Sequence, residues 1–186
     1  MKKYILSFTA LSLSLTLGLG AGTILQGHAN EHERETHAVS VKVNSLEEEM
    51  DLPQVIVEGK VVEELPVFVQ DAGLDSRINF EFPVTPSKVK VTKVIAGDIS
   101  TDEEITFYQH GDRNTQKDGF VKPGEEVMLL LQKTPEGNYW SYSYENGLWR
   151  IKDNKVLSKG DKAIYKELQN LDRAEFENKI INAVKN

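Results

Sequence analysis

Residues 88–110 read KVKVTKVIAGDISTDEEITFYQH, and this stretch decides the fold class. Apolar side chains recur at every second position, at Val89 and Val91 and again at Ile105 and Phe107. A period of two places alternate side chains on opposite faces of an extended chain, which is typical of a strand with one buried face. The sequence therefore predicts two successive strands, at 88–95 and 105–110, with a turn at Gly97-Asp98.

Strand patterns continue on both sides of this pair. Val55–Val62 also alternates, whereas the VMLLL run within 126–132 is apolar on both faces and predicts a central strand. Asn146-Gly147 is a strong hairpin signal, because both residues accept a positive φ, and it predicts a turn between strands at 139–145 and 148–152. Further short apolar stretches predict a hairpin between 67–69 and 78–82 and a last strand at 155–157.

A helix is expected at each end of this set of strands. Ser45 and Glu48 form a capping box, which predicts a short helix. Near the carboxyl end, Phe176, Ile180 and Val184 recur every four residues and share one face of an amphipathic helix, which must cover an open end or face of the sheet. We predict a mostly β fold with flanking helices: a small antiparallel, five- to six-stranded OB-like barrel plus a C-terminal amphipathic helix, in one domain over residues 45–186.

The first 29 residues have the layout of a secretory signal peptide. Lys2 and Lys3 are basic, residues 5–19 are apolar and rich in leucine, and small residues precede a cut after Ala29. A cut after Ala38 is the alternative, and an uncleaved anchor is disfavoured because the apolar run is short for a span of ~20 residues. We expect a secreted, extracellular protein with no stable membrane anchor after cleavage, beginning with a polar tail over residues 30–44.

The composition excludes several classes of function. The 186 residues include 22 Lys and Arg, 29 Asp and Glu and no Cys, for a net charge of -7. Cleavage after residue 29 removes two lysines and no acid, so the charge becomes -9. Such a chain disfavours nucleic acid as a partner, since neutralising phosphates needs a surplus of basic residues. The lack of cysteine excludes disulfides, thiolate metal sites and cysteine nucleophiles, and in a secreted protein it favours a Gram-positive exterior.

The sequence contains no complete catalytic or metal-binding set. His110 lies beside the predicted barrel, but the nucleophile and the orienting partner that triad chemistry needs are missing. We therefore assign no catalytic residue, no metal and no cofactor. The other candidates are His32, Glu33, Glu35 and His37, whose spacing does not suit a helical metal site, and Asp112, Asn114 and Asp118, whose loop departs from the EF-hand pattern.

Aromatic side chains give the best candidate for a binding site. Trp140, Tyr142 and Tyr144 alternate with smaller residues and should project from one face of a strand. Exposed, such a row would stack on sugar rings; buried, which is the commoner fate of aromatic residues in a small barrel, it would be part of the core. Both alternatives stay open here, and Tyr108 and His110 complete the set of candidate binding residues.

The runs VIVEGKVVEE, KPGEEVMLLL and LDRAEFENKI occur in this order around the central stretch. In element order and turn placement, residues 45–185 resemble a family of small secreted proteins of Gram-positive bacteria, mostly uncharacterised and similar to the OB-like barrels of netrin and metalloprotease-inhibitor domains. The resemblance implies the barrel fold. The inhibitor domains act through an N-terminal cysteine that binds a zinc ion, and because this chain has no cysteine, no functional residue is transferred.

These observations predict a secreted, non-enzymatic binding or interaction module whose partner is an extracellular protein or a cell-wall glycan. The polar loops at 65–86 and 111–122 are the expected contact surface. Two alternatives are an extracellular hydrolase that uses acidic residues with His110, and a protease-inhibitor-like protein. A cavity that holds His110 with two carboxylates would favour the hydrolase, whereas an exposed aromatic strip would favour the binding module.

Overall fold

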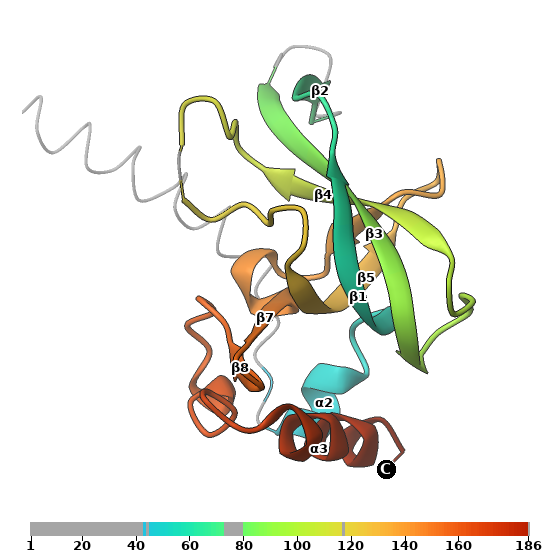
Figure 1. Ribbon diagram of the computed structural model, residues 1–186, viewed down its shortest axis with the longest axis vertical. Helices are drawn as coiled ribbons and strands as arrows, with labels where there is room; N and C mark the ends of the chain where they lie inside the picture. Colours follow the sequence, from blue (N-terminus) through green and yellow to red (C-terminus); the bar gives the residue numbers. More distant parts are fainter. Residues whose placement is uncertain (1–42, 44, 73–79, 117, 186) are drawn as a thin grey trace, which may run out of the picture. The chain divides into compact units, whose positions relative to one another are not determined.

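The computed structural model describes residues 43, 45–72, 80–116 and 118–185, and one sheet of eight strands dominates this part of the chain (Figure 1). The predicted mostly β class with flanking helices is confirmed. The strands are β1 (Val55–Glu64), β2 (Phe68–Asp71), β3 (Glu81–Ala96), β4 (Glu104–His110), β5 (Glu126–Lys133), β6 (Tyr139–Ser141), β7 (Leu148–Lys152) and β8 (Lys155–Leu157). The helices are α2 (Leu46–Met50) and α3 (Arg173–Lys185), with the 3₁₀ helices η1 (Tyr144–Gly147) and η2 (Ala163–Tyr165).

Five of the strands pair in a closed ring. β1 pairs with β3, β3 with β4, β4 with β6, β6 with β5, and β5 again with β1. One pairing differs from the antiparallel prediction: β4 and β6 are parallel, with Tyr108 opposite Trp140. The reason is that β5 intervenes in the chain and runs antiparallel to β6, so that β6 returns beside β4 in the same direction. This parallel pair positions the candidate site described below.

The expected hairpin between 67–69 and 78–82 is present in the described residues as the pairing of β2 with the start of β3. Phe68 lies opposite Val84, and Asp71 opposite Glu81. The described part of region 65–86, which we expected to be a polar contact loop, thus includes the strand residues 68–71 and 81–86. Pro83 and Pro86 have no backbone N–H to donate to a neighbouring strand, which disfavours a strand here. The strand forms nevertheless, because β3 pairs with β2 on one side and with β4 on the other.

The predicted hairpin at Asn146-Gly147 is wrong. β6 ends at Ser141, and both turn residues belong to η1. β6 and β7 do not meet because both pair with the same edge of β5, β6 at Leu131–Lys133 and β7 at Glu126–Leu129. A strong local turn signal is overridden here by pairing with a strand that lies elsewhere in the sequence.

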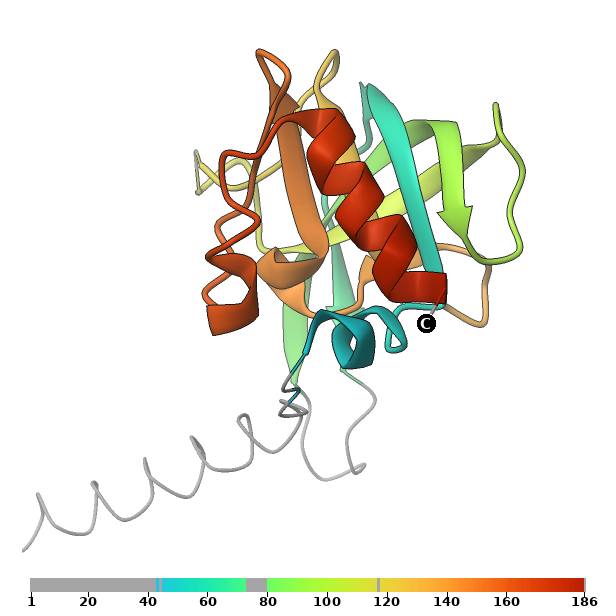
Figure 2. The same cartoon turned by 90° about the horizontal axis from the view of Figure 1, so that it is seen from below.

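Buried apolar side chains form two cores, one on each face of the same strands. The first fills the ring and includes Val57, Phe107 and Leu129, and the second lies between the outer face of the sheet and the helices. β5 contributes alternate residues to both cores, which confirms the prediction of a strand buried on both faces. Figure 2 shows α3 lying across the sheet, and Phe176 packs on Trp149 with ring centroids 4.7 Å apart.

The two helices match the predicted N-terminal cap and the predicted apolar face. The Ser45 hydroxyl accepts a hydrogen bond from the backbone N–H of Glu48 at 3.3 Å. On α3, Phe176 and Ile180 are buried as expected, but Ala183 is buried more fully than Val184, because 3.6 residues per turn shift the apolar face after two turns.

No helix within the described ranges is both long and apolar enough to cross a membrane. The predicted signal peptide at 1–29 and all of the predicted tail except Val43 lie outside the described residues.

Candidate functional site

A group of seven ring-bearing side chains lies on the outside of the ring of strands, and we call it the aromatic surface. It consists of Phe68, Phe80, Phe82, Tyr108, His110, Trp140 and Tyr144. Four of the five candidate binding residues named from the sequence belong to it. The three phenylalanines are not among the candidate binding residues that we predicted from the sequence. The only sequence feature that points to them is the apolar character of the two strands of the predicted hairpin.

The centre of the aromatic surface follows from strand register. Because Tyr108 lies opposite Trp140 in the parallel pair, their rings meet edge to face with centroids 5.2 Å apart. His110 lies two residues beyond Tyr108 and so projects from the same face of β4. Its imidazole stacks on Trp140 with centroids 4.3 Å apart and planes inclined by 21°. Two neighbouring strands thus present three rings in direct contact.

Phenylalanines extend this centre toward β2 and the start of β3. Phe82 contacts His110 with ring centroids 5.0 Å apart, and Phe80 follows it. Phe68 meets Tyr108 edge to face at 5.5 Å. Phe68 and Phe80 keep 37% and 54% of their surface exposed, so this arm of the aromatic surface is open to solvent.

Tyr144 closes the other side, although it is not on a strand. Its backbone has a positive φ of 48°, and its carbonyl accepts a hydrogen bond from the Ser141 hydroxyl, which turns the chain back beside β6. The Tyr144 ring lies 4.7 Å from that of His110 and is 68% exposed. The row predicted from alternation is therefore formed by a turn and not by a continuous strand.

Tyr142 does not join the aromatic surface. Its hydroxyl lies 2.8 Å from that of Tyr165 and 3.2 Å from the Nζ of Lys162, in a polar cluster beneath the helices. The predicted single face for Trp140, Tyr142 and Tyr144 is wrong, because strict alternation ends where β6 ends.

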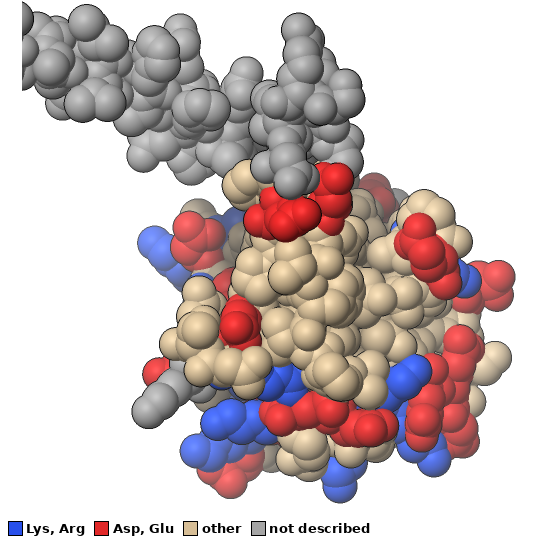
Figure 3. Space-filling view, turned by 90° about the horizontal axis from the view of Figure 1, so that it is seen from above, with Lys and Arg blue, Asp and Glu red and all other residues tan. Residues whose placement is uncertain are grey.

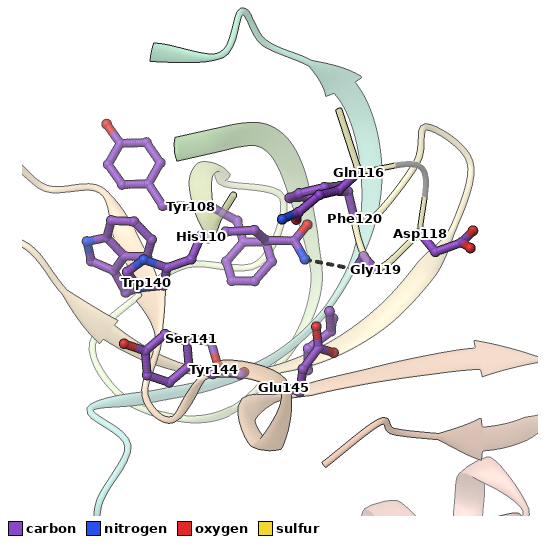
Figure 4. A pocket seen from close by; sticks show the side chains of 13 residues that line it. Tyr108, His110, Gln116, Asp118, Gly119, Phe120, Trp140, Ser141, Tyr144 and Glu145 are labelled. Carbon is purple, nitrogen blue, oxygen red and sulfur yellow. Dashed lines mark hydrogen bonds between the residues drawn. The ribbon is translucent and has the colours of Figure 1, made fainter. Parts of the chain in front are cut away.

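A cavity of about 120 Å³ opens beside the aromatic surface (Figure 4). Its walls come from β4, β6, η1 and the loop before β5. Within the loop, the carbonyl of Gly119 accepts a hydrogen bond from Gln109 Nε2 at 3.1 Å, which fixes the loop against β4. Residues of region 111–122, from which we expect part of the contact surface, therefore line this cavity. The polar lining residues are Gln109, His110, Gln116, Asp118, Ser141 and Glu145.

The charges around the cavity are set by two carboxylates and a histidine. Burial lowers the pKa of His110 below its ordinary value, which favours the neutral imidazole. Figure 4 shows the Glu145 carboxylate directed toward the cavity and that of Asp118 directed away from it. Burial, with a smaller effect of Glu136, raises the pKa of Tyr108 and keeps its hydroxyl protonated.

Seen from the end at which β2 lies, the molecule has a broad uncharged area with charged residues around it (Figure 3).

The candidate metal ligands that lie within the described residues do not come together as a site. Within the described residues, no group of three or more His, Asp or Glu side chains is arranged to hold a metal ion. Asp112 Oδ1 accepts a hydrogen bond from the backbone N–H of Asn114 at 2.7 Å, so it stabilises a local turn. The tail residues His32, Glu33, Glu35 and His37 lie outside the described residues.

The sequence matches no protein-family model and no curated protein.

Proposed function

We propose that this protein is a secreted, non-enzymatic binding module that holds its ligand, an extracellular protein or a cell-wall glycan, on the aromatic surface. The observation that carries the proposal is the unbroken contact of seven rings on the outside of the sheet, of which Phe68, Phe80 and Tyr144 are exposed. Contiguous exposed apolar area of this kind is unusual for a monomeric protein and typical of interaction sites.

Rigidity of the rings favours binding over a purely structural role. Tyr108, His110 and Trp140 stand on paired strands and contact one another, so little conformational freedom is lost when a ligand stacks on them. Peptide side chains and the apolar faces of sugars both suit such a surface, since each combines an apolar face with polar groups at its edge. The excess of acidic residues speaks against nucleic acid.

A hydrolase is the second candidate, and one observation favours it. His110, Asp118 and Glu145 line the same cavity, although of the two carboxylates only that of Glu145 is directed into it. Against it, the imidazole of His110 is held by rings and not by a polar partner that would orient it as a base. The nearby Ser141 hydroxyl donates to the carbonyl of Tyr144, which leaves it poorly placed as a nucleophile.

The test is a pull-down with the mature protein, residues 30–186, against cell-wall fragments and proteins of the culture supernatant. We expect Trp140→Ala and Tyr144→Ala each to weaken retention about tenfold or more, since each removes a ring on which a ligand stacks. Tyr142→Phe is the matched control, because this tyrosine lies in the same segment but outside the aromatic surface.

Two results would contradict the proposal. Equal loss of retention in Tyr142→Phe would show that the effect reflects the fold and not the aromatic surface. Mass spectrometry of the retained ligand separates the second candidate: cleavage of the ligand by the wild type but not by His110→Ala would establish the hydrolase in its place.

A further inference from the structure

The cavity beside the aromatic surface contains a carboxylate oxygen without a protein partner. Oε2 of Glu145 is buried and accepts no hydrogen bond from the described residues. A buried carboxylate oxygen without a hydrogen-bond partner is unfavourable, and more so when the carboxylate is charged. Glu145 lines the cavity, so a group that enters the cavity is placed to satisfy this oxygen.

No basic side chain among the described lining residues of the cavity neutralises Glu145. Among the described lining residues there is no Lys or Arg. Arg150 reaches the wall from outside, but it donates to the carbonyl of Gly119 and pairs with Glu125 at 3.5 Å. His110 has its pKa lowered by burial, so at neutral pH its imidazole adds no positive charge. The cavity therefore holds a negative charge that a ligand cation would balance.

Aromatic rings beside this carboxylate are also suited to a cation. Trp140, Tyr144 and His110 line the cavity together, and the faces of Trp and Tyr rings attract a cation at about 6 Å or less. A guanidinium group suits the site better than an ammonium group, because it is planar, stacks on rings and forms two parallel hydrogen bonds with a carboxylate.

The size of the cavity sets the size of the group that enters. Its volume is about 120 Å³. An engineered protein cavity of about 150 Å³ accommodates benzene, so this one accommodates a single guanidinium head group and not a second residue. The rest of such a ligand must lie outside, where the aromatic surface is continuous with the cavity through Trp140 and Tyr144.

We propose that the cavity binds the side chain of an arginine in an extended peptide segment of an extracellular protein, with neighbouring apolar residues of that segment on the aromatic surface. This inference rests on the proposed function and narrows its ligand to a protein. A glycan offers hydroxyl donors to Glu145 but carries no positive charge. The test must therefore distinguish an arginine ligand from a glycan ligand.

The test compares two synthetic peptides, acetyl-Phe-Arg-Phe-amide and the same peptide with citrulline in place of arginine. Citrulline has nearly the same shape as arginine but is uncharged. We expect wild-type protein to bind the arginine peptide about tenfold more tightly in calorimetric titration, which corresponds to ~1.4 kcal/mol. Glu145→Gln should bind the two peptides equally. Asp118→Asn is the matched control and should keep the preference, because its carboxylate points away from the cavity.

The possible results separate this inference from the proposed function. Equal binding of both peptides by wild type, or a preference that survives in Glu145→Gln, overturns the arginine site. Binding of N-acetylglucosamine oligomers that needs Trp140 but not Glu145 also overturns it while leaving the aromatic surface as a glycan site. Unchanged thermal unfolding of Glu145→Gln ensures that a lost preference reports on binding and not on the fold.

Discussion

Glu58→Gln tests how α3 is attached to the sheet. Glu58 projects from β1 toward α3 and is only 1% exposed. Its Oε2 accepts a hydrogen bond from Arg173, while Oε1 accepts none from the described residues. The neighbouring Glu177 carboxyl is close enough to share a proton with Glu58. Arg173 also binds Glu126 at 3.0 Å and Glu177 at 3.1 Å, and Glu177 pairs in turn with Lys93 on β3.

Burial raises the pKa of Glu58 from 4.5 to about 7, because the loss of hydration and the contact with Glu177 outweigh the attraction of Arg173. The hydrogen bond from Glu58 lowers the pKa of Glu177 to about 2, so over the range between these values the pair shares one proton, held by Glu58. A raised pKa means that the folded protein binds this proton more tightly than the unfolded chain. The resulting stability is fully present below pH 4.5 and is lost as the pH rises through about 7.

Linkage then gives the magnitude. Between pH 6 and pH 8.5 the Glu58 proton should account for a loss of about 1 kcal/mol in the free energy of unfolding. Urea denaturation at both pH values measures it for wild type and for the variant. In Glu58→Gln this loss should disappear, since glutamine imitates the protonated carboxyl at every pH.

Glu126→Gln is the control for this measurement. It removes another carboxylate that contacts Arg173, but one whose side chain is 49% exposed, and it should keep the wild-type dependence on pH. The reasoning is refuted if Glu58→Gln loses stability between pH 6 and pH 8.5 as much as the wild type does.

Three further predictions concern the packing around the sheet, each measured as the free energy of unfolding in urea. Gly147→Ala should destabilise the fold by about 1–3 kcal/mol, because the new methyl group would lie 2.7 Å from the carbonyl oxygen of Leu130. Phe176→Ala should lose about 3–5 kcal/mol from the second core, against about 1 kcal/mol for the less buried Val184→Ala; equal losses would contradict the observed orientation of α3. Lys162→Ala should lose about 3–5 kcal/mol, because it removes the cation that lies 2.7 Å from a fully buried Glu49 carboxylate; an unchanged free energy of unfolding would contradict this.

The candidate site could be predicted in part, and the reason is visible in its residues. Tyr108, His110 and Trp140 could be named because they lie on strands that do form, but their alternation did not decide between burial and exposure. Tyr142 was assigned wrongly because alternation was extended past Ser141, where the chain turns. Glu145 gave no sequence signal that separates it from other acidic residues, since its importance comes from a cavity built by distant segments.

The local sequence pattern was enough to place most of the strands, because the spacing of a strand's own apolar residues indicates whether one or both of its faces are buried. The same holds for the helix over residues 173–185, whose apolar face requires a surface to cover. Tertiary structure alone decided which strands are neighbours. β6 pairs with β4 in parallel, and β7 pairs with β5 and not with β6, as a local hairpin at Asn146-Gly147 would require. Pairing of this kind depends on where a distant strand offers unpaired backbone groups, and no local spacing of residues encodes that position.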